Sequence, residues 1–119
     1  MAQKKWSITL YPKYINFMRT GKKTVEGRCN TGMFKKINVG DSISFFSKKD
    51  SNNEITMEVV EKREYISFKE LIEAEGVQAM LPDLNQGEAD VALKIYRQIP
   101  GYVLKEKKFG VVALQLKKI

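Results

Sequence analysis

The segment near the C-terminal end places the strongest constraint on the fold. Residues 109–116 read Phe-Gly-Val-Val-Ala-Leu-Gln-Leu, so they are apolar on both faces for most of their length. A strand with one face in water alternates apolar and polar side chains, whereas a run of this kind is typical of a strand covered on both faces. We therefore expect a sheet in which residues 109–116 form a central strand.

Four other segments supply partners for this strand. Alternation of apolar and polar side chains predicts strands at Trp6–Leu10 and Ser42–Ser47, and the same alternation returns in a segment that ends at Arg28. A long strand at Glu54–Glu64 follows the polar hairpin loop of residues 48–53. Its length suggests the wall of a coiled sheet or barrel.

Start and stop signals predict the first two helices. The first spans Tyr11–Thr20, with Pro12 in its first turn and Gly21 as a left-handed cap. The second opens with the capping-box pattern Ser67-Phe68-Lys69-Glu70 and ends at Gly76.

A third helix is expected at Gly87–Gln98, capped by Asp83 or Asn85. One further helical turn is expected before it, at residues 77–81. The charged run Lys105–Lys108 is interpreted as the approach to the last strand.

The irregular basic segment of residues 29–39 is expected to be a loop. Together the elements predict a small α+β fold: a mixed, mostly antiparallel, partly closed β-barrel of about five strands with about three helices. A chain of 119 residues is long enough for one hydrophobic core, so we expect a single domain over residues 1–119.

The octet Gly21-Lys22-Lys23-Thr24-Val25-Glu26-Gly27-Arg28 gathers a lysine, a hydroxyl, a carboxylate and a guanidinium. In a strand, Val25 would point to one face and the polar side chains of positions 24, 26 and 28 to the other. Residues two apart are separated by roughly 6.6 to 6.8 Å, so Glu26 and Arg28 can pair or reach one planar ligand together. Carboxylates accept from base amino groups and guanidinium donates to carbonyl or phosphate oxygens. The octet is therefore a candidate site for a nucleobase or nucleotide.

The same residues also have a plain structural interpretation. Glu26 and Arg28 can form an exposed ion pair worth about 0 to 1 kcal/mol, and the lysines can belong to an ordinary solvated turn. For Arg97 a solvated helix face is an equal alternative to a ligand contact.

The charge and composition of the chain limit the kinds of partner and catalytic site that it can have. The net charge of +7 favours anionic partners, of which nucleic acid is the commonest. The absence of histidine excludes imidazole metal sites and Ser-His or Cys-His nucleophile pairs, and the single Cys29 excludes an internal disulfide. We expect no metal and no cofactor. The N-terminal residues suggest neither a signal peptide nor a membrane span, so we expect a cytoplasmic protein.

The octet resembles the motif of the ASCH domain, a family of the PUA-like superfamily. The motif Gly-x-Lys-x-x-Glu-x-Arg appears here as Gly21, Lys23, Glu26 and Arg28. Further matching pieces run along nearly the whole chain, as in a small stand-alone member of prokaryotic type: Gly40-Asp41, Tyr65 with Ser67-Phe68, Leu81-Pro82, Tyr96-Arg97 and Phe109-Gly110-Val111.

The resemblance implies a β-barrel with a cleft whose floor carries the motif, and a role in binding RNA or a nucleotide. Our leading hypothesis is a binding module in which Glu26 and Arg28 hold a polar base edge. Lys22, Lys23 and Arg97 would then lie near phosphate.

Two alternatives remain open. Some family members are amidohydrolases that remove the acetyl group of N4-acetylcytidine, with the motif Gly-x-Lys-Thr-x-Thr-x-Arg. Here Glu26 stands at the catalytic threonine position, so such an enzyme would use Lys23 as base, Thr24 as nucleophile and Glu26 as orienting group or acid. The family's catalytic glutamate, which lies ahead of the last helix, has no secure counterpart among the nearby Asp83 and Glu88. The second alternative is a protein-interaction domain.

Overall fold

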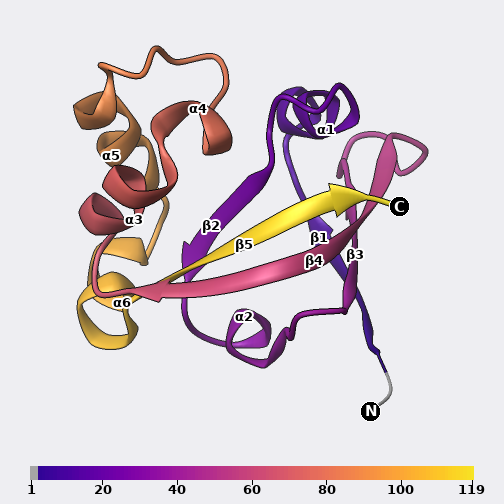
Figure 1. Cartoon of the computed structure of the whole chain (residues 1–119), viewed down its shortest axis with the longest axis horizontal. Helices are drawn as coiled ribbons and strands as arrows, with labels where there is room; N and C mark the ends of the chain where they lie inside the picture. The colour runs from indigo at the N-terminus through magenta and orange to yellow at the C-terminus, as the bar shows by residue number, and fades with distance from the viewer. Residues whose placement is uncertain (1–2) are drawn as a thin grey trace.

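The computed structural model describes residues 3–119, and in it five strands form one strongly curved sheet (Figure 1). The order of the strands across the sheet is β1-β3-β4-β5-β2. The strands are β1 (Lys5–Thr9), β2 (Val25–Cys29), β3 (Ser42–Phe46), β4 (Glu54–Tyr65) and β5 (Val111–Lys118). The β1–β3 pair is parallel and the other three pairs are antiparallel. The expected α+β, mostly antiparallel and partly closed barrel is thus confirmed.

The predicted central strand is also confirmed, because β5 lies between β4 and β2. It begins at Val111, two residues later than predicted, since Gly110 ends the preceding helix with a φ of 73°. Its side chains alternate between two hydrophobic clusters. Ala113 belongs to the cluster that also contains Phe68, Leu71 and Tyr96, and Leu114 belongs to the cluster inside the barrel.

Within residues 3–119 six helical segments flank the sheet, where about three helices and one further helical turn were predicted. They are α1 (Pro12–Arg19), α2 (Met33–Lys36), α3 (Phe68–Glu75), α4 (Val77–Met80), α5 (Ala89–Arg97) and α6 (Tyr102–Phe109). Four of them, α3 to α6, gather at one end of the sheet, while α1 lies against the barrel at the other end (Figure 1). No helix within residues 3–119 has both the length and the apolar character needed to cross a bilayer.

Two expectations about helices were wrong. The run Lys105–Lys108 is part of α6 rather than an approach to the last strand, because Gly101 starts a helix that turns the Glu106 side chain inward. The segment 29–39 is not wholly irregular, since it contains the single turn α2.

The helix ends mostly follow the predicted signals. Gly21 has the expected left-handed backbone, with a φ of 80°, and the Ser67 side chain accepts a hydrogen bond from the Glu70 N–H at 3.2 Å. The predicted cap of the third helix was wrong. This helix begins after Glu88, whose side chain accepts a hydrogen bond from the backbone N–H of Asn85 at 2.9 Å.

Candidate functional site

The barrel is open between the free edge of β2 and the end of β1, and a cleft of about 730 Å³ lies there. Its walls come from four parts of the chain. Thr9 and the start of α1 form one side, and the motif residues of β2 lie opposite them. Residues 47–49, which follow β3, and the connection between α5 and α6 complete the rim. The predicted motif therefore lines a cleft.

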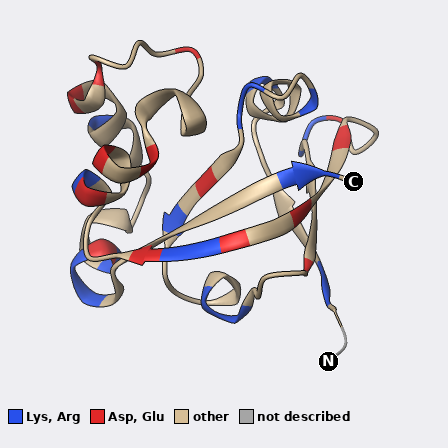
Figure 2. Cartoon of the chain, viewed as in Figure 1, with Lys and Arg blue, Asp and Glu red and all other residues tan. Residues whose placement is uncertain are grey.

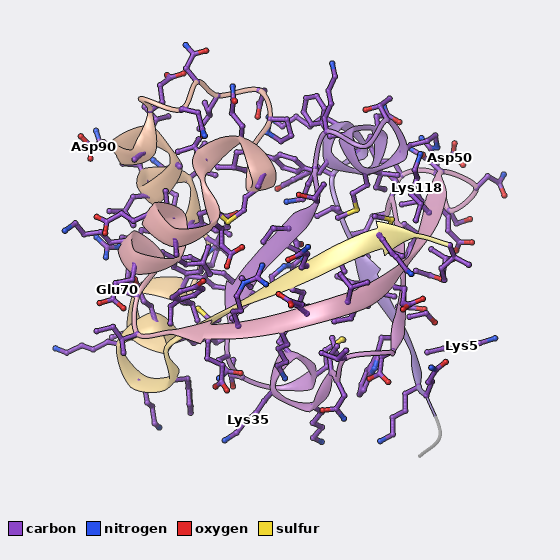
Figure 3. All side chains as sticks on the ribbon, in the orientation of Figure 1. Lys5, Lys35, Asp50, Glu70, Asp90 and Lys118 are labelled. Atoms are coloured by element: carbon purple, nitrogen blue, oxygen red, sulfur yellow. The ribbon has the colours of Figure 1, made fainter. Side chains whose placement is uncertain are left out.

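Lys23 is the most deeply buried charged residue of this cleft, with 2% of its side chain exposed. Its ammonium donates hydrogen bonds to the carbonyl oxygens of Val25 at 2.8 Å and Met80 at 2.7 Å. It also lies 3.1 Å from Oε1 of Glu26. An ammonium has three hydrogens and a neutral amine has two, so three acceptors are satisfied together only by the charged form. By contrast, the labelled Lys5 and Lys35 in Figure 3 extend into solvent.

The pKa values of this pair reflect burial opposed by opposite charge. Burial lowers the pKa of Lys23, and the neighbouring carboxylate of Glu26 only partly opposes that effect. For Glu26, burial raises the pKa, but the charges of Lys23 and Arg28 outweigh it, so its pKa is lowered. Glu26 therefore stays ionised between two cations.

Arg28 connects the buried carboxylate to the cleft. Its Nε and Nη2 lie 2.9 and 2.8 Å from Oε2 of Glu26, and its guanidinium lies over the Phe34 ring at 5.0 Å. The Arg28 side chain is 21% exposed, against 5% for Glu26. The ion pair is therefore a largely buried one and not the exposed pair of the plain interpretation. Because the guanidinium is planar, its Nη1 side points away from Glu26, toward the cleft that Arg28 and Tyr102 line.

Three tyrosines surround this ion pair from three different helices. Tyr14, Tyr96 and Tyr102 all line the cleft. Burial raises the pKa of each phenol, and the negative charge of Glu26 raises each one further. The three hydroxyl groups are therefore protonated at neutral pH and can donate hydrogen bonds. The sequence pointed to Tyr96 only through the Tyr96-Arg97 piece of the ASCH resemblance, and it gave no signal for the other two.

Three predicted site residues lie away from the cleft. Thr24 and Lys22 are exposed and are not among the residues that line the cleft. The strand begins only at Val25, so its alternation does not extend to Thr24. Arg97 instead pairs with the buried carboxylate of Glu106 at 3.2 Å. That carboxylate also accepts a hydrogen bond from the backbone N–H of Phe68 and so holds α6 against the start of α3.

The two candidates for a catalytic acid are engaged elsewhere. Asp83 pairs with Lys13 at 3.0 Å on the surface, and Glu88 accepts the hydrogen bond from Asn85. Neither residue lines the cleft. Burial, with a smaller contribution from Glu106, raises the pKa of Cys29 to about 11, so this thiol is not an activated nucleophile.

The positive charge at the cleft comes partly from residues that sequence reasoning placed in a hairpin loop. Lys48 and Lys49 are exposed at its rim, next to the buried Ser47. Elsewhere the basic side chains are spread over α1, α2, α6 and β4 rather than gathered on one element (Figure 2). Within residues 3–119 no cluster of His, Cys, Asp or Glu has the arrangement of a metal site.

A curved five-stranded sheet with a cleft at its open edge, and helices packed over one end, defines the class of PUA-like α+β proteins. Within that class the chain belongs to the ASCH domain family, whose model matches residues 8–119. No curated protein matches the chain significantly.

Solved structures agree with this assignment. The crystal structure of the hypothetical protein PH0355 is similar over 97% of this chain and 99% of that one, with 35% identity and a TM-score of 0.85. The solution NMR structure of protein PF0455 from Pyrococcus furiosus is similar over 97% of both chains, with 30% identity and a TM-score of 0.77. The ASCH protein from Zymomonas mobilis shares the fold, with 16% identity and a TM-score of 0.61 over 94% of this chain and 66% of that one.

Proposed function

We propose that the protein binds a nucleotide unit, either free or within RNA, in the cleft at the open edge of the barrel. The observation that carries the proposal is the chain of contacts from Lys23 through Glu26 to Arg28. Two buried groups hold one guanidinium in a fixed orientation at the cleft surface. A fixed, forked donor of this kind suits the paired acceptors of a base or a phosphate.

The surroundings of Arg28 support the same class of ligand. Tyr14 and Tyr102 are partly exposed aromatic residues in the cleft, and aromatic faces are the usual platforms for unstacked bases. Lys48 and Lys49 at the rim supply positive charge for a phosphate. A cleft of about 730 Å³ lies within the size range of small-molecule sites.

The amidohydrolase alternative has less support. The hydroxyl that would act as nucleophile belongs to Thr24, which does not line the cleft. All three hydrogens of the Lys23 ammonium have acceptors, so this group is not poised to take a proton from a neighbouring hydroxyl. We would test the alternative by incubating pure protein with N4-acetylcytidine and following cytidine release by chromatography.

The binding proposal is tested with a fluorescently labelled single-stranded RNA oligonucleotide, whose anisotropy is measured as protein is added. Arg28→Ala should weaken binding by about tenfold or more, since a hydrogen bond to a charged group contributes about 1.5 to 3 kcal/mol. Arg28→Lys keeps a cation beside Glu26 and should also weaken binding, because it removes the planar fork.

Lys107→Ala is the matched control. It removes one positive charge from α6, outside the residues that line the cleft. Thermal melting of all variants shows whether each one is folded. If folded Arg28→Lys and Arg28→Ala proteins bound the RNA as tightly as Lys107→Ala, the cleft would not be the binding site.

A further inference from the structure

The free edge of β2 has one residue whose backbone is left without a partner. In the antiparallel β2–β5 pair, Gly27 lies opposite Ala113. The bonds that flank the pair join the N–H of Leu116 to the carbonyl of Thr24 at 2.8 Å, and the N–H of Asn30 to the carbonyl of Gly110 at 3.0 Å. Even-numbered residues of β2 therefore bond to β5, and the backbone groups of Val25, Gly27 and Cys29 point away from it.

The protein satisfies the carbonyls on either side of Gly27. That of Val25 accepts a hydrogen bond from the Lys23 ammonium at 2.8 Å, and that of Cys29 accepts one from the backbone N–H of Thr31 at 2.9 Å. Within residues 3–119 neither the N–H nor the carbonyl of Gly27 has such a partner beyond the sheet, and Gly27 lines the cleft. A strand edge with a free donor and a free acceptor is a site for an extended or planar partner.

The Tyr96 hydroxyl lies over one face of Gly27, next to the side chains of Leu71 and Met80. It is 3.5 Å from the position that a Cβ atom on Gly27 would occupy. Tyr96 is only 5% exposed, its ring stacks on Phe68 with centroids 4.6 Å apart, and its hydroxyl has no hydrogen-bond partner among the described residues. Within residues 3–119 the only fully buried side-chain nitrogen or oxygen without a hydrogen-bond partner is Asn30 Oδ1. The unpartnered Tyr96 hydroxyl is therefore not fully buried. The hydroxyl therefore opens onto the cleft that Tyr96 lines.

Donors outnumber acceptors around this point. The N–H of Gly27, the hydroxyl of Tyr96 and the outer side of Arg28 can all donate, and the carbonyl of Gly27 accepts. Each carboxylate oxygen of Glu26 already faces a cation, Lys23 at one and Arg28 at the other, and only 5% of the side chain is exposed, so the donors around Gly27 dominate what a ligand meets here. A ligand edge with two acceptors around one donor is the best match to this set.

We propose that Gly27 and Tyr96 determine specificity by binding an imide edge, in which one ring N–H stands between two carbonyl groups, as in uracil. The inference rests on the proposed nucleotide-binding function and deepens it. The ring N–H would donate to the Gly27 carbonyl, and the two ring carbonyls would accept from the Gly27 N–H and the Tyr96 hydroxyl. This is the edge that a base uses for pairing, so the site takes an unpaired base, either free or in single-stranded RNA.

The test compares uridine monophosphate with nucleotides altered at this edge or away from it, with affinities measured by isothermal titration calorimetry. Uridine monophosphate and 5-methyluridine monophosphate keep the imide edge and should bind alike. 3-Methyluridine monophosphate loses the ring N–H, and cytidine monophosphate replaces one carbonyl with an amino group. Each should bind more weakly by about fivefold or more, since a mismatched edge leaves a buried donor or acceptor unpaired.

Tyr96→Phe supplies the protein side of the test, because it removes the hydroxyl and keeps the ring that stacks on Phe68. This variant should lower the ratio of the affinity for uridine monophosphate to that for cytidine monophosphate. The ligand series on the unmodified protein remains informative even if the variant does not fold. If nucleotides bound through Arg28 but 3-methyluridine monophosphate bound as tightly as uridine monophosphate, the specificity assignment would be overturned and the binding function would stand. If no nucleotide and no RNA bound, the proposed function itself would fail.

Discussion

The ammonium of Lys23 lies 3.1 Å from the carboxylate of Glu26, and neither side chain exposes more than 5% of its surface. Removing the Lys23 charge leaves Glu26 with Arg28 as its single cation and deprives the buried carbonyls of Val25 and Met80 of their donor, which costs more than the pair contributes relative to apolar residues. We therefore expect Lys23→Met to lower the free energy of unfolding by about 3 to 5 kcal/mol, although the methionine side chain has a similar volume.

Urea denaturation followed by circular dichroism measures this loss. Lys22→Met is the matched control, because the neighbouring Lys22 is exposed and its replacement should change stability by no more than about 0.5 kcal/mol. Equal stabilities of the two variants would show that the buried pair is not formed.

Acid should unfold the protein through three carboxyl groups whose pKa values are lowered in the folded state. For Glu26 and Asp41, burial raises the pKa, but charges in the first case and hydrogen bonds in the second outweigh it. For Glu75, the hydrogen bond from Arg63 lowers the pKa against a smaller effect of burial. The unfolded chain then binds protons more readily than the folded one. The stability contributed by these groups is present at neutral pH and is lost as pH falls below their ordinary values of 4.5 and 3.8.

A series of urea denaturations between pH 7 and pH 3 measures this dependence. Replacing Glu75 by glutamine should make the acid loss shallower, whereas replacing the exposed Glu73 should leave it unchanged. A free energy of unfolding that stayed constant or rose on acidification would contradict the assignment.

Two glycines with positive φ should respond differently to alanine. Gly21 and Gly110 have φ values of 80° and 73°. A Cβ at Gly21 would meet nothing within 4 Å, whereas at Gly110 it would lie 2.8 Å from the backbone oxygen of Tyr65. Alanine at Gly21 should cost about 1 to 2 kcal/mol for the left-handed backbone alone. Alanine at Gly110 should cost clearly more, because a Cβ there meets the Tyr65 oxygen and the backbone has a ψ of −166°; thermal denaturation measures the difference between the two variants. Equal losses would mean that the contact relaxes freely.

Arg97 should prove important for stability and neutral for binding. Its guanidinium bonds to Glu106, which holds two helices together, and it does not line the cleft. We expect Arg97→Ala to lower the free energy of unfolding by about 1 to 3 kcal/mol. Its RNA affinity should match that of Lys107→Ala, which removes the same charge from another surface. A loss as large as that of Arg28→Ala would instead place Arg97 in the binding site.

Features that depend on neighbouring residues could be read from the sequence. Pro12 and Gly21 determine where the first helix starts and stops, and Ser67 caps the second, because each signal acts within a few positions. The helix α6 was missed for the opposite reason. Val103 and Leu104 are exposed on it, and the residue that it buries is Glu106, so it lacks the apolar face that marks a helix in a sequence.

The same distinction between local and long-range contacts applies to the candidate site. The pairing of Glu26 with Arg28 could be anticipated, since it follows from strand geometry within three residues. The acceptor that completes the environment of Lys23 is the carbonyl of Met80, which lies 57 positions away. The Tyr96 hydroxyl is brought to Gly27 from a different element altogether. No local pattern encodes such distances, because they depend on how the helices pack over the sheet.

The pairing of β2 with β5 determines the order in which the strands of the sheet can pair during translation. The β1, β3 and β4 strands can associate once residue 65 has left the ribosome, but β2 has no partner until residues 111–118 appear. Such non-local pairing is slow to form and leaves an unpaired strand exposed in the meantime. The nascent chain therefore exposes β2, the strand with the cleft motif, as an unpaired strand, and the pairing of β5 with β2 completes the wall of the cleft.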